Sequence, residues 1–221
     1  QGAETRIERA RLLVGADGAG SLVRKRAFAG RRMPKSYIGI QEWFAADQAP
    51  PYFSAIFARD ITDFYAWTIP KNGRLILGAA LATGGDAPAT FERLKEKLVE
   101  YGMTFGTPLK RESGLLLRPT RVGGLCVGGD GVALVGEAAG WISPSSAEGL
   151  SYAFRSAMAL ADALARAPDR PLAAYRRRSA SLRRNIALKN LKSPFIYSRP
   201  LRRAVMRLGL GSVAVRQEAP R

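Results

Sequence analysis

A glycine-rich turn with a single early carboxylate is the part of the chain best suited to chemistry. Residues 136–149 read GEAAGWISPSSAEG, and an apolar run at 132–135 leads directly into them. A helical pattern at 150–165 follows at once. The first N–H groups of a helix are unpaired and its dipole is positive there, so this turn suits a polar, electron-rich ligand.

A second turn of similar composition lies near the start of the chain. Residues 12–24 read LLVGADGAGSLVR, in which Gly15 and Gly18 let the backbone turn sharply off an apolar strand. Asp17 can accept backbone N–H groups within this turn, and Ser21 is suited to be the N-cap of a short helix. The pattern predicts a strand, a tight turn and a helix.

The two turns, in this order, resemble the internal flavin motifs of the flavoprotein family that includes geranylgeranyl reductases and para-hydroxybenzoate-hydroxylase-like monooxygenases. The resemblance implies an FAD cofactor. It also implies a Rossmann-like FAD-binding layer built from both parts of the chain. The cofactor contacts implied are Gly15, Asp17, Gly18, Arg24, Gly136, Glu137, Ala138, Pro144, Gly149 and Leu150.

The resemblance also gives these residues roles. Most of the family has Asp at the position of Glu137, where the carboxylate binds a ribityl hydroxyl; Glu can make the same bond or accept local N–H groups. Pro144 would set the elbow, Gly149 would admit the isoalloxazine edge, and N–H groups near Leu150 would stabilise the reduced ring. Arg24 would reach a phosphate or support its turn.

A third match, YAWTIP at 65–70, resembles the YxWxFP motif that lines the isoprenoid pocket of geranylgeranyl reductases. Strand alternation places Tyr65, Trp67 and Ile69 on one face, as a substrate wall or as an ordinary sheet core. The resemblance implies an enzyme that reduces carbon–carbon double bonds of an isoprenoid or similar apolar substrate, with NAD(P)H or another electron donor. Gly140 stands where hydroxylases of this fold usually carry His, which argues mildly against the monooxygenase alternative.

No side chain is an obvious catalytic acid, base or nucleophile. The sequence has no His and one Cys, Cys126, which excludes Ser-His-Asp hydrolysis, histidine metal sites, an internal disulfide and a cysteine zinc site. The catalytic residues stay unknown and no metal is predicted. The resemblance implies that the flavin supplies the hydride, with a proton from water or Tyr65.

Positive charge is concentrated at the end of the chain. The net charge is +17, and residues 166–221 hold fifteen Lys or Arg against two acids. This tail is expected to contact an anionic membrane surface or to be a solvated helix; without a nucleic-acid motif, nucleic acid is the less favoured partner. A non-catalytic basic module that binds membranes or nucleic acid stays open as a different class. We expect a cytoplasmic protein, at most peripheral at the inner membrane face.

The fold class predicted is α/β (α+β). Residues 1–34 and 121–167 would form part of a Rossmann-like FAD-binding layer, with a substrate-binding antiparallel sheet at 35–120 inserted between them and a basic helical tail at 168–221. One helix is predicted at 90–101. The strands predicted for the inserted sheet lie at 37–44, 52–57, 64–69 and 75–81, with a hairpin turn at Asn72-Gly73.

The family's dinucleotide-binding unit has no counterpart in the sequence. The chain begins at Gln1, and no G-x-G-x-x-G segment precedes the first motif. A GxGxxA spelling at 209–214 is followed by too few residues to build a βαβ unit. We therefore expect an N-terminally truncated flavoprotein, and whether this chain alone binds FAD stays open.

Overall fold

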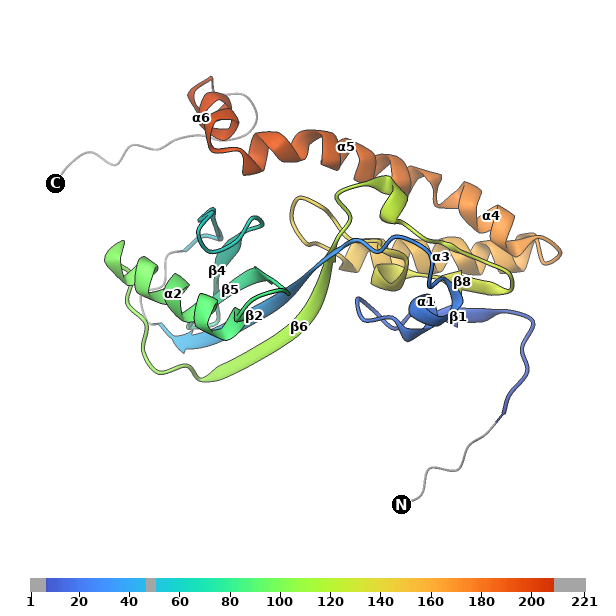
Figure 1. Ribbon diagram of the computed structural model, residues 1–221, viewed down its shortest axis with the longest axis horizontal. Helices are drawn as coiled ribbons and strands as arrows, with labels where there is room; N and C mark the ends of the chain where they lie inside the picture. The colour runs from blue at the N-terminus through green and yellow to red at the C-terminus, as the bar shows by residue number, and fades with distance from the viewer. Residues whose placement is uncertain (1–6, 47–50, 209–221) are drawn as a thin grey trace, which may run out of the picture. The chain divides into compact units, whose positions relative to one another are not determined.

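The computed structural model describes residues 7–46 and 51–208, which form two compact units (Figure 1). Unit 1 comprises Gln1–Lys35 and Leu117–Ala187, and unit 2 comprises Ser36–Leu116 and Leu188–Arg221. Both predicted flavin motifs belong to unit 1. The predicted substrate motif belongs to unit 2.

Unit 1 contains a three-stranded sheet in the order β1-β8-β7. Strands β1 (Leu13–Gly15) and β8 (Val132–Leu134) pair in parallel, and β7 (Gly128–Gly129) adds an antiparallel edge. Parallel strands are normally covered on both faces; Ala133 and Leu134 of β8 are fully buried, whereas Leu13 and Val14 of β1 are 52% and 42% exposed. The pairing joins the two predicted motif strands, which lie far apart in the sequence.

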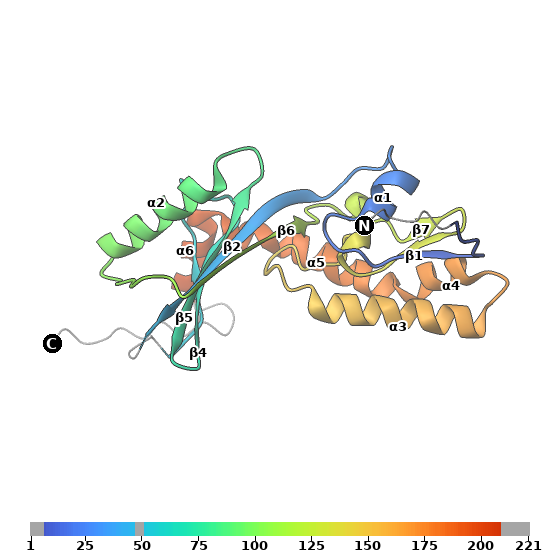
Figure 2. The ribbon, with the colours of Figure 1, turned by 90° about the horizontal axis from the view of Figure 1, so that it is seen from below.

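Helical elements supply most of the buried core of unit 1. Helix α3 lies alongside α4 (Figure 2). The largest buried side chains of this core include Trp141 and Tyr175. The helical elements are α1 (Leu22–Ala27), η1 (Val122–Gly124), η2 (Gly136–Ala139), α3 (Leu150–Arg166), α4 (Pro171–Arg178) and the first part of α5 (Ala180–Tyr197).

Unit 2 is built on a five-stranded sheet. Neighbouring strands β3/β4, β4/β5 and β5/β2 pair in antiparallel fashion. Asn72 and Gly73 connect β4 and β5 with φ values of 51° and 69°, as a two-residue hairpin turn requires, which confirms the predicted hairpin. The strands in spatial order are β3 (Ser54–Ile56), β4 (Ala66–Lys71), β5 (Arg74–Ala82), β2 (Lys35–Ala45) and β6 (Lys110–Arg118).

Helix α2 (Ala87–Glu100) packs on one face of this sheet. Phe91 and Leu94 of the helix are fully buried in one cluster with Leu77 of β5. The helix begins three residues earlier than predicted, because the Asp86 side chain accepts the Ala89 N–H at 2.9 Å and so provides the N-cap.

The basic tail is not a separate body, in contrast to the predicted domain at 168–221. Residues up to Ala187 belong to unit 1 because Tyr175, Leu182 and Ile186 are buried in its core. The remainder, with α6 (Arg199–Arg207), belongs to unit 2. The GxGxxA spelling at 209–214 lies outside the described residues.

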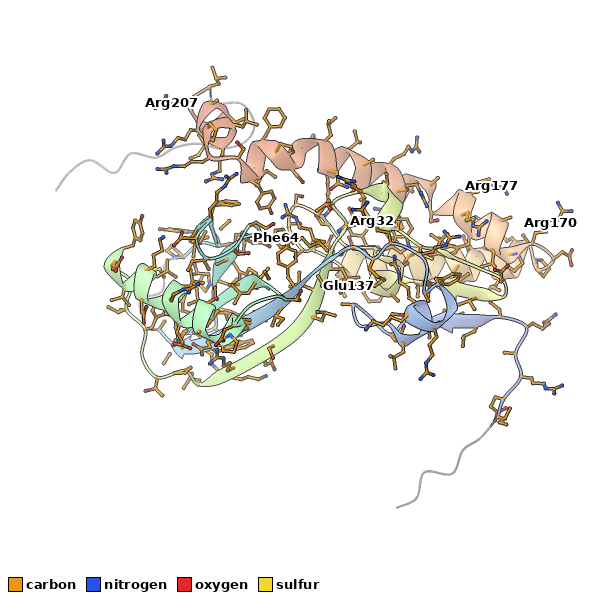
Figure 3. The ribbon with its side chains drawn as sticks, viewed as in Figure 1. Arg32, Phe64, Glu137, Arg170, Arg177 and Arg207 are labelled. Atoms are coloured by element: carbon orange, nitrogen blue, oxygen red, sulfur yellow. The ribbon has the colours of Figure 1, made fainter. Side chains whose placement is uncertain are left out.

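Basic side chains of α4 and of the turn before it are exposed. Figure 3 shows Arg170 and Arg177 directed away from the ribbon. Over residues 7–46 and 51–208, none of the helices combines the length and the apolar character that a bilayer crossing needs.

Candidate functional site

The two flavin-motif turns leave neighbouring strands of one sheet. Gly15 at the end of β1 lies opposite Leu134 at the end of β8, and the Val135 N–H donates to the Gly15 carbonyl at 3.0 Å. Because the strands are parallel, both turns start from the same end of the sheet, where the two strands have their carboxyl ends. We call residues 16–21 the Asp17 turn and residues 135–140 the Glu137 turn.

The Asp17 turn uses its carboxylate to cap α1. Asp17 accepts the Ser21 hydroxyl at 2.6 Å, the Leu22 N–H at 2.8 Å and the Val23 N–H at 3.2 Å. Slight burial raises the pKa of Asp17, but these hydrogen bonds outweigh it and leave the pKa below its ordinary value. The carboxylate is thus satisfied by its own turn.

Ser21 is the N-cap of α1, as the sequence predicted. Its side chain accepts the Arg24 N–H at 3.0 Å. Together with the Asp17 contacts, this bond pairs backbone donors that the helix itself leaves unsatisfied.

Two glycines make the turn after β1 sterically feasible. A Cβ at Gly15 would lie 2.6 Å from Leu134 Cδ2 and 2.9 Å from Val23 Cβ, so a larger residue would push the strand ends and α1 apart. Gly18 has φ +71°, a conformation that L side chains rarely adopt.

Arg24 joins the two turns from inside the protein. It is 1% exposed, and its guanidinium donates to the carbonyls of Gly124 (2.6 Å), Arg32 (3.1 Å) and Ala138 (3.2 Å). Burial lowers the pKa of Arg24, and within the described residues its Nε has no partner. Of the two predicted roles, this geometry matches support of the turn, because both Nη groups of the buried guanidinium donate to backbone carbonyls.

The Glu137 turn is the 3₁₀ segment η2, with left-handed glycines at both ends. Gly136 has φ +54° and Gly140 has φ +86°. The Gly136 N–H donates to Ser156 Oγ of α3 at 2.9 Å. Ala138, another predicted cofactor residue, is fully buried and its carbonyl accepts Arg24.

Glu137, labelled in Figure 3, is partly buried, and its carboxylate accepts fewer hydrogen bonds from the described residues than that of Asp17. Its Oε1 accepts the Leu117 N–H at 2.6 Å, and this is the single hydrogen bond to the Glu137 carboxylate found among the described residues. Burial raises the pKa of Glu137, and the Leu117 bond offsets part of that rise. Besides the Leu117 N–H, the carboxylate could therefore accept a hydroxyl group of a ligand.

The segment between the Glu137 turn and α3 contains the predicted proline elbow. The buried Pro144 offers its carbonyl to Arg118 Nε at 2.9 Å. Gly149 precedes α3 as its N-cap residue, and the Leu150 side chain is 71% exposed.

Glu148 caps α3, which the sequence interpretation missed. Its carboxylate accepts the Ser151 N–H at 2.8 Å and the Ser151 hydroxyl at 3.0 Å. An acidic residue two positions before a helix was the available signal. Glu148 brings negative charge to the same helix end that was expected to face an electron-rich ring.

A buried pair of aromatic residues, Trp141 and Tyr175, links the segment after the Glu137 turn to strand β8. Trp141 Nε1 donates to the Tyr175 hydroxyl at 3.2 Å, and that hydroxyl donates to the Leu134 carbonyl of β8 at 2.8 Å. Burial raises the pKa of Tyr175 to about 12. The contact crosses from α4 to the strand end, and the sequence spacing did not indicate it.

The predicted substrate residues lie in unit 2. Tyr65 and Trp67 are buried, with ring centroids 5.3 Å apart, and Ile69 is partly buried. The Trp67 indole lies over Gly78, where a Cβ would come within 2.3 Å of the ring. Burial raises the pKa of Tyr65. The three residues thus include one compact aromatic pair on and next to β4.

The chain matches no protein family model. It is similar to Protein CbrA of Escherichia coli O9:H4, with 40% identity over 211 residues, and to Protein CbrA of Shigella flexneri serotype 5b, with 39% identity. Both matches cover 96% of this chain and 57% of the relative, so the chain spans little more than half the length of these relatives.

Three solved structures have a similar fold. A geranylgeranyl bacteriochlorophyll reductase-like protein from Thermoplasma acidophilum aligns with a TM-score of 0.67 and 18% identity, over 87% of this chain and 51% of that protein. CmlS, a flavin-dependent halogenase, aligns at 0.56 with 17% identity, over 80% and 35%. HpxO of Klebsiella pneumoniae complexed with FAD aligns at 0.53 with 19% identity, over 87% and 55%. The chain therefore has the mixed α/β fold of these proteins, as predicted.

Proposed function

We propose that this protein is an FAD-dependent oxidoreductase that reduces carbon–carbon double bonds of an isoprenoid or similar apolar substrate. One observation carries the proposal: two turns that resemble flavin motifs leave adjacent parallel strands, and one of them keeps a partly buried carboxylate that accepts one donor among the described residues. The fold shared with a geranylgeranyl reductase-like protein and with an FAD-bound enzyme supports it.

The chain's residues fit the cofactor unevenly. Glu137 would accept a ribityl hydroxyl, while the glycines at 136 and 140 keep its turn narrow. The backbone near Pro144, Gly149 and Leu150 would lie against the ring system. Asp17 and Arg24 would act by shaping the layer, because the Asp17 carboxylate and both Nη groups of Arg24 are hydrogen-bonded within the protein. Gly15 and Gly18 would contribute by allowing the turn.

Bound FAD would supply hydride transfer, which no side chain of this protein can provide. The chain would bind and orient the substrate with Tyr65, Trp67 and Ile69. Burial raises the pKa of Tyr65, so its hydroxyl stays protonated at neutral pH and could donate the proton to the double-bond carbon that does not take the hydride. Gly140 in place of a His favours the reductase over the monooxygenase.

NAD(P)H is proposed as the electron donor. A peripheral membrane contact through the exposed arginines of α4 and α6 is proposed as the route to a lipid substrate. Neither α4 nor α6 has an acidic residue in its range. Binding to anionic vesicles that weakens at high salt would be the signature of such a contact.

The test uses the complete product of the natural gene with NAD(P)H and an unsaturated isoprenoid. The proposal expects consumption of NAD(P)H, a saturated product and no dependence on oxygen. A hydroxylated product formed with oxygen uptake would instead establish the monooxygenase alternative. If the purified protein contains no flavin and shows no flavin-dependent turnover, both the reductase and the monooxygenase are rejected.

A further inference from the structure

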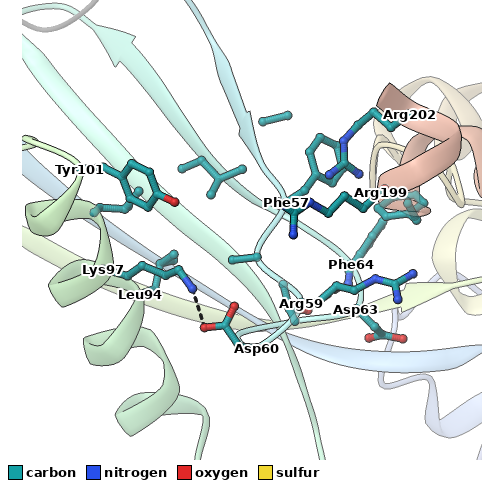
Figure 4. Close-up of a pocket in the computed structure, with 16 residues that line it drawn as sticks. Phe57, Arg59, Asp60, Asp63, Phe64, Leu94, Lys97, Tyr101, Arg199 and Arg202 are labelled. Atoms are coloured by element: carbon teal, nitrogen blue, oxygen red, sulfur yellow. Dashed lines mark hydrogen bonds and ion pairs between the residues drawn. The ribbon is translucent and has the colours of Figure 1, made fainter. Parts of the chain in front are cut away.

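A pocket of about 920 Å³ lies within unit 2, and none of the proposed cofactor or substrate residues lines it (Figure 4). The loop after β3, the last turns of α2 and the start of α6 form its walls. All of these segments belong to unit 2, so the pocket is a property of this unit alone.

Three arginines line one side of the pocket, opposite Lys97 and Tyr101 (Figure 4). Arg202 is held in place, because its Nη1 donates to the Ile196 carbonyl at 2.6 Å and its guanidinium lies 4.4 Å from the Phe57 ring centroid. Arg59 and Arg199 are exposed, and neither forms an ion pair with any described residue.

The pocket has two acids against four cations, Arg59, Arg199, Arg202 and Lys97. Asp60 is paired with Lys97 of α2 at 2.6 Å. Asp63 accepts the hydroxyl of Tyr37 at 3.0 Å. The pocket therefore has a surplus of positive charge.

The arginines also affect one another. Burial lowers the pKa of Arg202, and the charges of Arg199 and Arg59 lower it further. Like charges held close together are relieved by an anion, and the planar guanidinium fork matches the geometry of a phosphate.

Most of the rest of the wall is apolar. The rings of Phe57 and Phe64 each contact Tyr197, at centroid distances of 5.7 and 5.6 Å and interplanar angles of 70° and 49°. Leu94 and Leu98 of α2 add aliphatic surface. The rings pack against each other at steep angles, which suits a hydrocarbon chain better than a flat base.

We propose that this pocket binds a phosphate-bearing amphiphile, with the phosphate on Arg59 and Arg199 and the chain along the aromatic wall. The phosphate could belong to a free alkyl or prenyl phosphate or to a lipid headgroup in a bilayer. The proposal does not depend on FAD, so it can fail or hold independently of the proposed oxidoreductase.

Isothermal titration calorimetry on the full chain tests it, with decyl phosphate, inorganic phosphate, decanol and AMP as probes below any micelle concentration. Decyl phosphate should bind about tenfold or more tighter than inorganic phosphate, because each buried methylene adds about three- to fourfold. Tighter binding of AMP or decanol than of decyl phosphate would overturn the assignment.

The double variant Arg59→Gln/Arg199→Gln should weaken decyl phosphate binding by about tenfold or more. Arg9→Gln/Arg26→Gln is the matched control, since both residues are exposed in unit 1, lie outside α4 and α6, and form no ion pair with any described residue, and the net charge changes equally. Circular dichroism melting checks the fold, and either single variant replaces a double variant that fails to fold. Equal affinities of the two double variants would contradict the proposal.

Vesicles of phosphatidylcholine with phosphatidic acid separate the two sources of the phosphate. Flotation lost in Arg59→Gln/Arg199→Gln but kept in the control would assign the pocket to a bilayer headgroup. Binding of decyl phosphate without such flotation would assign it to a free amphiphile. If Arg59→Gln/Arg199→Gln changes neither the affinity for decyl phosphate nor the flotation with vesicles, the proposed site is rejected.

Discussion

The Asp17 turn and the Glu137 turn leave neighbouring strands of one sheet but use their carboxylates in opposite ways. Asp17 is exposed, accepts three hydrogen bonds from its own turn and α1, and has a lowered pKa. Glu137 is partly buried, accepts one backbone N–H and has a raised pKa. The comparison indicates that Asp17 holds the scaffold and that Glu137 remains available to a ligand.

The largest effect should come from breaking the link between the two turns. Arg24→Met would leave three carbonyls without their donor and should lower the free energy of unfolding by about 3–5 kcal/mol. Chemical denaturation measures it. Arg26→Met, in the same helix but exposed, is the control and should change the stability little.

Glu137→Ala should weaken FAD binding to the complete gene product by about 10- to 100-fold, the value of a hydrogen bond to a charged group. Asp17→Ala should change FAD affinity far less. Quenching of FAD fluorescence measures both, with Glu96→Ala as a control for loss of an exposed carboxylate. Equal losses for Glu137→Ala and Asp17→Ala would show that the two turns do not differ in the way inferred.

Gly15→Ala tests how closely the two turns must approach. Its Cβ would lie 2.6 Å from Leu134 Cδ2, and such overpacking should cost about 1–3 kcal/mol of stability. Gly20→Ala is the matched control, because nothing lies within 4 Å of its Cβ. Thermal melting of both variants should separate them clearly; identical melting points would argue against tight packing at the strand ends.

Asp17→Ala should destabilise the chain by about 0.5–2 kcal/mol at neutral pH through loss of the α1 cap. The folded state lowers the pKa of Asp17, so its contribution is present above the pKa of the unfolded chain and is lost as pH falls through the lowered value. Denaturation at a series of pH values should therefore show wild type and variant converging in acid. A gap that persists there would point to lost packing instead.

Glu137→Gln should give the smallest change in the free energy of unfolding, and its pH dependence should be opposite in sign to that of Asp17→Ala. The folded state raises the pKa of Glu137, so wild-type stability is highest below the pKa of the unfolded chain and declines as pH rises through the raised value. The variant lacks this titration, and its free energy of unfolding relative to wild type should increase with pH. A difference that is independent of pH would mean that Glu137 ionises without penalty.

Local rules predicted much of the fold. Ser21 caps α1, Asn72-Gly73 forms the hairpin, and helix α3 starts at Leu150, because each depends on neighbouring residues only. The two flavin-motif strands are neighbours, as predicted. That prediction rested on the family resemblance, because no local pattern contains a long-range pairing.

Long-range contacts account for what the sequence did not predict. Tyr175 was read as part of a detached tail, yet its hydroxyl joins Trp141 to β8 and holds α4 in unit 1. The candidate site shows the same limit: two carbonyl partners of Arg24, those of Gly124 and Ala138, lie 100 and 114 residues away in the sequence. Spacing in the sequence could identify these residue types but not their partners.

The visible absorbance spectrum of the complete natural gene product, purified under native conditions, tests the central claim most directly. The account predicts the two bands of an oxidised flavin, bleached on addition of NAD(P)H. A colourless protein that neither copurifies with FAD nor binds it when supplied would contradict it.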